Sequence, residues 1–215
     1  MRPDEVLDTL QRAGFEAWYV GGCVRDTLLG RPIHDWDVTT SALPEQVLAL
    51  FPRTVPTGLQ HGTVTVLSDS GPVEVTTYRA DGDYHDGRHP DGVRFVRSLR
   101  EDTARRDFTV NAMAMDQRGN IRDFYGGRAD LAAGILRCVG APERRFREDA
   151  LRMLRACRFA AQLGFAIEPE TWAALLRCAP LCKQLSRERI TEEVTKTIRS
   201  PSPQWAAAMI RCGLL

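Results

Sequence analysis

Apolar and polar residues in the first part of the chain alternate with two different periods. Residues 4–13 and 43–51 have apolar side chains at helical spacing, and the second segment has a proline in its first turn, where helices accept one. Residues 34–40 alternate with the period of a strand. Residues 63–69 and 73–79 are β-branched, alternating segments separated by a short turn, which predicts a β-hairpin. This succession of strands and helices is typical of an α/β domain built on a sheet.

The other segments of this part extend the same prediction. Residues 17–30 have the pattern of a short apolar strand, a Gly-Gly turn and the start of a helix. Residues 105–116 begin as a helix or a loop and end as a strand, and residues 120–134 predict a turn followed by a helix. Residues 79–92 are polar, rich in Gly and Asp and without periodicity, which predicts a mobile loop.

The character of the chain changes after about residue 140, because strand patterns stop there. Helical periods separated by Gly, Pro and Ser predict helices at 148–165, 169–180, 186–198 and 203–215. We therefore expect one domain over residues 1–139 and a helical domain over residues 140–215. The last residues directly follow a helix, where a further helix is expected, so we expect the chain to be a fragment of a longer protein.

Composition places the chain among ordinary globular proteins. It has 215 residues, of which 43% are apolar and 27% charged. No apolar run approaches the roughly 20 residues that a membrane helix needs, and the N-terminus lacks the basic start and apolar block of a signal peptide. We therefore expect a cytoplasmic protein without membrane contact. The six cysteines form no CxxC pair, which predicts reduced core thiols and no zinc site.

Charge is uneven along the chain although the net charge is only +1. Arginines crowd one short segment, and this usage favours planar recognition with several donors. Lysine occurs only at positions 183 and 196, so a genome that favours arginine throughout is an equally open explanation. The crowded residues are Arg144, Arg145, Arg147, Arg152, Arg155 and Arg158.

An acidic pair is the first candidate for chemistry. Asp35 and Asp37 are two residues apart on a predicted strand, so both carboxylates point to one face. Such a pair is costly unless a cation lies between the carboxylates, and hard oxygen ligands favour Mg²⁺. Upstream, Gly21 and Gly22 allow close approach of a triphosphate to the backbone at a helix start, and Arg25 lies on the first turn of that helix.

The order GG-x-V-R-D, then D-x-D, then T-T over residues 21–40 resembles motif A of the class II nucleotidyltransferases. This family comprises the bacterial and eukaryotic CCA-adding enzymes and the bacterial poly(A) polymerases. The resemblance extends over roughly residues 15–200 with five motifs in family order. It implies an α+β fold: a polymerase-β-like nucleotidyltransferase head, with a mixed or antiparallel sheet and flanking helices, followed by an all-helical neck domain.

The segment RRDFTVNAMA resembles motif B of this family, which implies that Arg106 and Asp107 contact the ribose of the nucleotide. Taken alone, RRD is equally typical of a helix cap with an ion pair. Asn111 is expected to be structural. Residues 123–140 resemble motif C, a connector for which we expect a geometric role.

The segment EDALRMLRACRFAAQLGF resembles motif D, whose EDxxR pattern implies an amino-acid template for the incoming base. Here the pattern is Glu148, Asp149 and Arg152. Residues three apart share one face of a helix, so Asp149 can accept from the exocyclic amine of cytosine or adenine while Arg152 donates to ring acceptors. A helix with ordinary ion pairing is the alternative. The family also implies nucleotide roles for Arg155 and Arg158, although Arg158 lies nearly opposite Asp149 on a straight helix.

Two further expectations follow from the resemblance. Residues 186–198 resemble motif E, a helix that braces motif D, and we expect Arg189 and Glu193 to pair at i, i+4. Polymerase-β-like palms usually have a third acid on a neighbouring strand. Glu74 is the best candidate, and a solvent-facing strand glutamate is the alternative.

Two features narrow the activity within the family. The bacterial poly(A) polymerases usually have a basic-aromatic signature after the D-x-D segment, and residues 52–66 lack it, which favours a tRNA nucleotidyltransferase. CC-adding enzymes lack a flexible loop between motifs A and B. This chain retains a loop-like segment, in which four residues resemble the family's loop: Tyr84, Asp86, Arg88 and Pro90. The motifs do not separate CCA-adding from A-adding-only activity.

The resemblance thus implies transfer of C, A or both from CTP and ATP to the 3′ end of the tRNA acceptor arm. Mg²⁺ is the expected cofactor, and Asp35, Asp37 and Glu74 are the expected catalytic acids. A non-catalytic tRNA-binding fragment is the alternative from another class. The sequence says nothing about the oligomeric state.

Overall fold

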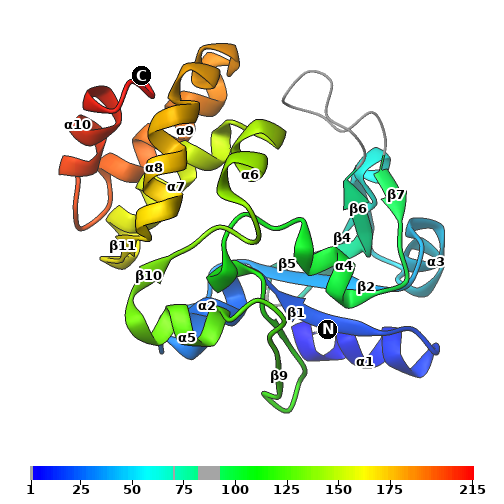
Figure 1. Cartoon of the computed structure of the whole chain (residues 1–215). Helices are drawn as coiled ribbons and strands as arrows, with labels where there is room; N and C mark the ends of the chain where they lie inside the picture. The colour runs from blue at the N-terminus through cyan, green and yellow to red at the C-terminus, as the bar shows by residue number, and fades with distance from the viewer. Residues whose placement is uncertain (1, 70, 82–92) are drawn as a thin grey trace. The chain divides into compact units, whose positions relative to one another are not determined.

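A computed structural model describes residues 2–69, 71–81 and 93–215 (Figure 1). The chain forms two compact units. Among the described residues, the first unit contains 2–69, 71–81, 93–106 and 111–127, and the second contains 107–110 and 128–215. Residues 107–110 and 128–139 are thus grouped with the second unit, and the predicted domain boundary at residue 139 stays a prediction.

The first unit is built on a seven-stranded sheet with the strand order β3-β4-β5-β2-β1-β8-β9. The pair β2 and β5 is parallel and the other neighbours are antiparallel, so the sheet is mixed. The predicted hairpin is confirmed as β4 and β5. The strands are β1 (Ala17–Val20), β2 (Trp36–Thr40), β3 (Thr54–Gly58), β4 (Thr63–Ser68), β5 (Gly71–Thr77), β8 (Ala114–Met115) and β9 (Ile121–Arg122).

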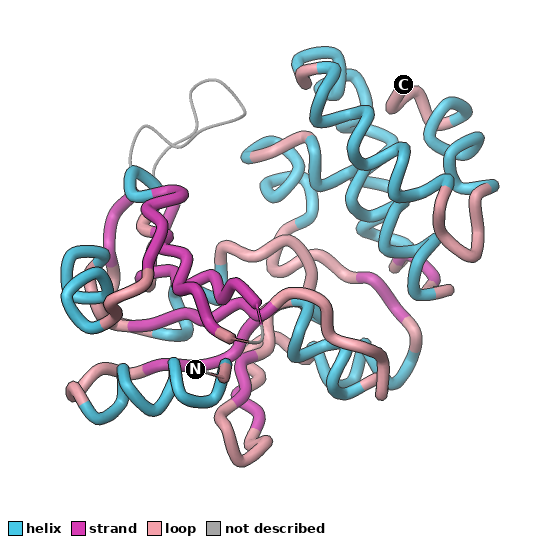
Figure 2. Tube along the Cα trace, turned by 180° about the vertical axis from the view of Figure 1, so that it is seen from behind, coloured by secondary structure: helices cyan, strands magenta, loops and turns pink. Residues whose placement is uncertain are grey.

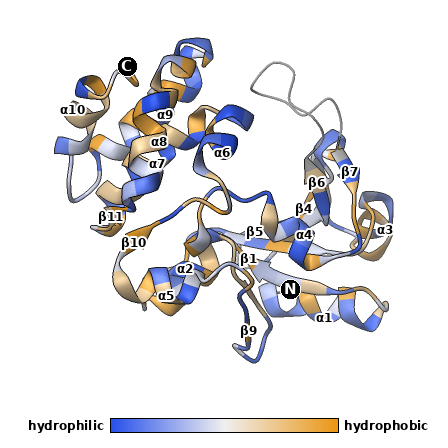
Figure 3. Cartoon of the chain, in the orientation of Figure 1, coloured by the Kyte–Doolittle hydropathy of each residue, from blue (hydrophilic) through white to orange (hydrophobic). Residues whose placement is uncertain are grey.

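Helices α1 and α3 pack against this sheet. The helix predicted at residues 4–13 is α1 (Pro3–Arg12), whose Val6, Leu7 and Leu10 are buried while its other positions after Pro3 carry polar groups (Figure 3). Burying each such side chain contributes roughly 2 kcal/mol. The unit's other helices are α2 (Gly22–Leu28), α3 (Pro44–Leu50), α4 (Leu99–Ala104) and the 3₁₀ turn η1 (Leu59–His61).

The prediction of a loop over residues 79–92 is wrong for its first three residues. Residues 79–81 form the strand β6 (Arg79–Asp81), which pairs antiparallel with β7 (Val93–Phe95). Three residues are too few to show a strand period, so no sequence pattern indicates this pairing. The family-like loop positions Tyr84, Asp86, Arg88 and Pro90 lie outside the described residues.

The second unit is predominantly helical (Figure 2). Helix α7 packs against α9 and α10, and α6 packs against α8. A parallel pair of two-residue strands, β10 (Ile135–Leu136) and β11 (Ala166–Ile167), corrects the expectation of helices alone after residue 140. The helices are α5 (Gly127–Ala133), which starts at the junction, α6 (Pro142–Glu148), α7 (Leu151–Leu163), α8 (Pro169–Cys178), η3 (Ala179–Gln184), α9 (Arg187–Ile198) and α10 (Gln204–Arg211).

The predicted core thiols are confirmed. All six cysteines are free, and all except Cys212 are buried. Burial raises the pKa of Cys157 and Cys182 to about 12, so these thiols stay protonated at neutral pH. In the described part of the chain, no helix is both long enough and apolar enough to cross a membrane.

Candidate active site

Two carboxylates lie side by side on one face of the first unit's sheet. Asp37 of β2 is directly paired with Glu74 of β5 in the parallel register. Directly paired residues on neighbouring strands point to the same face, so both side chains project from it. Glu74 is exposed and Asp37 is half-buried, while Asp35 is exposed just before β2 begins. The structure thus places the predicted third acid next to the second aspartate of the D-x-D segment.

The two faces of these strands differ in chemistry. On the face of Asp37 and Glu74 follow Thr39, Thr76 and Thr63, and the hydroxyls of Thr63 and Thr76 are 3.0 Å apart. The opposite face is apolar and packs under α1 and α3. Its buried residues are Val38, Val64, Val66, Val73 and Val75. The acids therefore lie on the polar side of the sheet, where the fold does not need apolar packing.

The absence of a side chain at Gly21 leaves room for the side chains of Arg106 and Asp37. The Gly21 φ of 73° lies in the region that favours glycine, and a Cβ built there would be 3.2 Å from Nη1 of Arg106 and 3.3 Å from Oδ2 of Asp37. The guanidinium of Arg106 and the carboxylate of Asp37 thus converge on the same small space. Gly21 is required there both for its backbone conformation and for its missing side chain.

Arg25 is buried and already has partners within the first unit. Its Nη1 donates to Oδ1 of Asn111 at 2.6 Å, and its Nη2 lies 2.9 Å from Oδ2 of Asp26. Asn111 is itself buried, which agrees with the structural role expected for it. A direct phosphate contact by Arg25 stays a prediction, because it requires exchange or sharing of these partners.

A divalent cation fits the oxygen ligands of the acidic group. Among the described residues, no cluster of three or more His, Cys, Asp or Glu side chains could bind a metal by itself. Mg²⁺ does not need such a cage, because it is usually bound through one or two carboxylates, substrate phosphates and water. Asp35 and Asp37, both oxygen ligands at the edge of the polar face, match that pattern.

The expected continuous helix over residues 148–165 is broken. Helix α6 ends at Glu148, Asp149 has extended backbone (φ −148°, ψ 108°), and α7 begins at Leu151. Oδ1 of Asp149 accepts a hydrogen bond from the backbone N–H of Leu151 at 3.0 Å, as a capping residue does. Asp149 thus lies before α7 and not within a continuous helix, while its carbonyl accepts from the backbone N–H of Arg152 at 3.1 Å. The predicted pairing of Asp149 and Arg152 at one base stays a prediction.

The other template candidates are bound by carboxylates. Nη1 of Arg152 lies 2.7 Å from Oε2 of Glu148 and also donates to the carbonyl of Arg145. Nη2 of Arg155 lies 2.7 Å from Oδ2 of Asp107, the predicted ribose-binding acid. These pairs lie within the second unit and fix the positions of both guanidinium groups.

The expected pair of Arg189 and Glu193 is also corrected. Arg189 donates to Oδ2 of Asp149 at 2.9 Å, and Glu193 accepts from Nε of Arg158 at 2.5 Å. Arg158 and Glu193 are both buried, and burial lowers the pKa of the arginine although Glu193 opposes that shift. Glu193 thus pairs with Arg158 of α7, and Arg189 pairs with Asp149, which precedes α7, in place of the expected pair within α9. Through Arg189, α9 holds Asp149, as the bracing role of this helix predicted.

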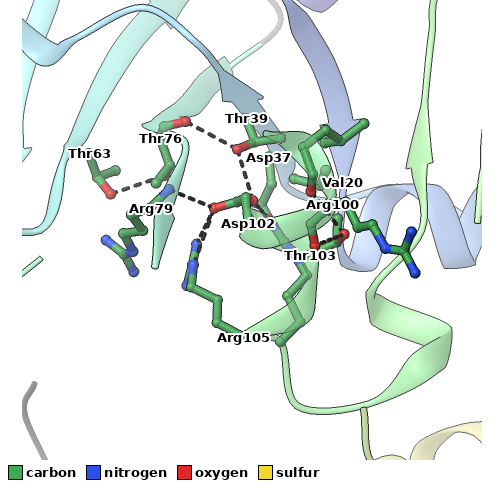
Figure 4. Close-up of polar contacts among 12 residues, drawn as sticks. Val20, Asp37, Thr39, Thr63, Thr76, Arg79, Arg100, Asp102, Thr103 and Arg105 are labelled. Atoms are coloured by element: carbon green, nitrogen blue, oxygen red, sulfur yellow. Dashed lines mark hydrogen bonds and ion pairs between the residues drawn. The ribbon is translucent and has the colours of Figure 1, made fainter. Parts of the chain in front are cut away.

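One buried acid near the site was missed from the sequence. Asp102 of α4 is fully buried and hydrogen-bonded to Thr39, two residues beyond Asp37 on β2 (Figure 4). Its only sequence signal is a position four residues before Arg106, which is the ordinary spacing of a helical ion pair.

Comparison with known proteins identifies the family. Residues 17–137 match the model of the poly(A) polymerase head domain, and residues 164–215 match that of the probable RNA- and SrmB-binding site of polymerase A. The chain therefore belongs to the poly(A) polymerase head family, which confirms the family predicted from the motifs.

Individual relatives agree with this assignment. The CCA-adding enzyme of Geobacillus stearothermophilus is 53% identical over 196 residues, which cover 91% of this chain and 48% of the relative. That of Lactiplantibacillus plantarum is 52% identical over 198 residues, covering 92% of this chain and 49% of the relative. The chain thus spans about half the length of these relatives.

Solved structures confirm the predicted fold class. The crystal structure of the Bacillus stearothermophilus CCA-adding enzyme in complex with CTP superposes with a TM-score of 0.90 at 47% identity, over 100% of this chain and 53% of that chain. A tRNA nucleotidyltransferase complexed with a primer tRNA and an incoming ATP analog has a TM-score of 0.77 at 28% identity, over 96% of this chain and 59% of that chain.

Proposed function

We propose that this chain is the nucleotide-transferring part of a CCA-adding tRNA nucleotidyltransferase. It transfers C and A from CTP and ATP to the 3′ end of tRNA and releases pyrophosphate. The observation that carries the proposal is the convergence of Asp37 and Arg106 at Gly21, with Glu74 paired to Asp37 on the polar face of the sheet. Support also comes from the 53% identity to a CCA-adding enzyme and from the likeness to a CTP complex of such an enzyme.

The acids of the first unit are assigned to the phosphate chemistry. The 3′ hydroxyl oxygen of the tRNA forms a bond to the α-phosphorus, and the bond from that phosphorus to the β-phosphate oxygen breaks. Asp35 and Asp37 would hold Mg²⁺, which supplies positive charge to the attacking and leaving oxygens when bound. Glu74 is the third acid beside them, and Arg106 places a fixed positive charge where the triphosphate approaches Gly21 and Gly22. Arg25 would reinforce that charge.

The residues of the second unit are assigned to nucleotide selection. Asp149 is bound by Leu151 and Arg189, yet a carboxylate has about four lone-pair sites and can also accept from the exocyclic amine of C or A. Arg152 donates to ring acceptors of the same base. Guanine and uracil present the opposite pattern at the amine position, so they would leave these groups unsatisfied.

The remaining arginines and Asp107 complete the proposed nucleotide site. Asp107 accepts from the sugar hydroxyls while Arg155 keeps it oriented. Arg158 is buried, and its assigned contact with the nucleotide requires Glu193 to share its guanidinium. The cytoplasmic location predicted from the sequence stays a prediction.

Primer extension tests the proposal. A tRNA that lacks CCA is incubated with the chain, Mg²⁺ and each nucleoside triphosphate alone or CTP and ATP together. We expect addition of CCA with the mixture and of C with CTP alone. Asp37→Asn serves as the inactive control, and Glu45→Gln, an exposed carboxylate on α3, as the active one.

The products separate the alternatives. Addition of A alone, and only to tRNA that already ends in CC, would identify an A-adding enzyme. Long A tails would indicate a poly(A) polymerase, and addition that stops after CC a CC-adding enzyme. Binding of CTP and ATP without any incorporation would overturn the catalytic assignment in favour of a binding fragment.

A further inference from the structure

A single buried carboxylate links the acidic strand to the arginines of the first unit. Asp102 of α4 is 0% exposed and accepts hydrogen bonds at both oxygens. Oδ1 accepts from the backbone N–H of Arg79 at 3.2 Å and from Nη2 of Arg105 at 3.0 Å. Oδ2 accepts from the hydroxyl of Thr39 at 3.0 Å and lies 3.5 Å from Nη2 of Arg106. In Figure 4 the contacts from Thr39, Arg79 and Arg105 meet at this one side chain.

These partners join elements that each contribute to the proposed site. Thr39 is on β2, two residues beyond Asp37 and on the same face of the sheet. Arg106 has its Nη1 beside Gly21 and Asp37, while its Nη2 points to Asp102. Nη1 of Arg106 thus faces the space at Gly21 that the half-buried Asp37 carboxylate also reaches, while its Nη2 faces the fully buried Asp102.

The charges around Asp102 divide into two roles. Burial opposes ionisation of Asp102, but Arg105 and Arg106 together hold its pKa below the usual range. Arg105 donates to the carboxylate through both Nε and Nη2 and is its main counterion. Arg106 makes the longer contact, at 3.5 Å against 3.0 Å for Arg105, and its Nη1 faces the space at Gly21 that Asp37 also reaches.

We propose that Asp102 is a positioning residue that holds Arg106 beside Asp37 for contact with the nucleotide triphosphate, with Arg105 as the counterion that frees Arg106 for this task. The inference rests on the function proposed above for the same site. Asp102 itself touches no reacting atom. Its effect passes through Arg106, so its loss matters only where Arg106 is present.

A double-mutant cycle tests this dependence. The variants Asp102→Asn, Arg106→Gln and the double variant are compared with the wild-type chain in nucleotide addition to tRNA, with kcat and KM for CTP and ATP measured separately. We expect Asp102→Asn to raise KM about tenfold, the change that one lost charge-assisted contact of about 1.4 kcal/mol produces. In the Arg106→Gln background the same change should alter KM less than twofold. Glu101→Gln, which removes an exposed charge from the same helix, should leave both constants unchanged.

The split between kcat and KM distinguishes positioning from simple damage to the fold. Partial unfolding lowers the amount of active protein and therefore kcat, but it leaves KM unchanged. A tenfold rise in KM that persists without Arg106, or a fall in kcat alone, would overturn the positioning role.

A second variant keeps the inference testable if Asp102→Asn does not fold. Arg105→Gln removes the guanidinium that is the main counterion of Asp102. The side chain of Arg105 is 16% exposed, and the buried acid itself stays in place. Asp102 should then draw Arg106 toward itself, and KM should again rise only while Arg106 is present. If the wild-type chain neither adds nor binds CTP and ATP, the proposed function falls together with this inference. If the wild-type chain is active and the substitutions act independently, only the positioning role falls.

Discussion

The two units treat their charged residues in different ways. In the first unit Asp35 and Glu74 are exposed, and two neighbouring arginines, Arg105 and Arg106, share one buried acid, Asp102. In the second unit every arginine that the motifs single out has a carboxylate partner, although Arg152 shares Glu148 with Arg144 and Arg145. These pairs are Arg152–Glu148, Arg155–Asp107, Arg158–Glu193 and Arg189–Asp149.

This difference corresponds to the two tasks proposed for the units. Phosphate chemistry needs carboxylates on an accessible polar face, where a cation and a triphosphate can reach them. Base selection needs donors and acceptors fixed in direction before the base arrives, since each ordered side chain otherwise costs binding energy. Internal ion pairs supply that order in the second unit. We therefore expect substitutions in the first unit to change kcat or the KM for the nucleotide, and those in the second to change stability or selectivity.

Removal of an acid from the polar face should give the largest effect. Asp37→Asn is expected to lower kcat by about 1,000-fold, equivalent to about 4 kcal/mol of lost transition-state stabilisation. The melting temperature should change little, because Asp37 is half-buried on the polar side of the sheet. Primer extension and thermal melting measure the two quantities. If the variant unfolds instead, Asp37 has a structural role, and the proposed difference between the two units does not hold for this residue.

The buried pair of the second unit should respond in the opposite way. Arg158→Met leaves Glu193, which is 4% exposed, without its partner, and we expect the free energy of unfolding to fall by about 3 kcal/mol. Urea denaturation measures this loss. Replacing both residues by methionine should recover much of it, because no buried charge then remains uncompensated. Equal stability of wild type and Arg158→Met would show that the pair is not structural.

Features that depend on neighbouring residues could be predicted from the sequence, and features that depend on contacts between distant residues could not. The hairpin of β4 and β5 and the position of Asp37 on β2 follow from local patterns, and the structure shows them where the patterns indicate, although β2 begins only after Asp35. The break at Asp149 was missed because no Gly or Pro interrupts the helical period there. It depends on a cap to Leu151 and on Arg189, which is distant in sequence.

The ion pairs show the same limit. Spacing alone favoured Arg189 with Glu193, but each of them is bound to a residue far along the chain. The Arg158–Glu193 contact is buried and the Arg189–Asp149 contact is half-buried, and an i, i+4 pair contributes only a few tenths of a kcal/mol. Asp102 has the spacing of a helical ion pair with Arg106, and only its burial distinguishes it from a solvated one. Local periodicity contains no information on such burial.

Selectivity should change when the capping acid of the second unit loses its charge. Asp149→Asn keeps an oxygen for the cap to Leu151 but presents an amide donor in place of an acceptor. Discrimination of CTP and ATP against GTP and UTP should fall by about 10- to 100-fold in the ratio of kcat/KM. The matched control is Glu170→Gln, an exposed acid on α8. Unchanged discrimination would contradict the assignment of Asp149 to the base.

A methyl group at Gly21 should have a smaller effect, centred on the first unit. Gly21→Ala places a Cβ 3.2 Å from Arg106 and 3.3 Å from Asp37, so one of them must shift, and we expect kcat/KM to fall about tenfold. Gly30→Ala is the control, because its φ is also positive (65°) but a Cβ there meets nothing within 4 Å. Both variants should lose about 1 kcal/mol of stability from backbone strain. Equal activity of the two would show that Gly21 matters for its backbone alone.

Thiol labelling compares the units with the least disturbance. Cys23 reports on the first unit and Cys157 on the second, and burial raises their pKa values to about 11 and about 12. At pH 7.5 both should resist iodoacetamide, whereas the half-buried Cys212 should react first. Since the thiolate is the reactive form, its fraction in Cys23 grows about tenfold per pH unit until the pH reaches the pKa. In low concentrations of urea, mass spectrometry of labelled peptides then shows which unit opens first. Simultaneous labelling of Cys23 and Cys157 at all urea concentrations would mean that the units unfold together, and the contrast between them would be confined to their chemistry.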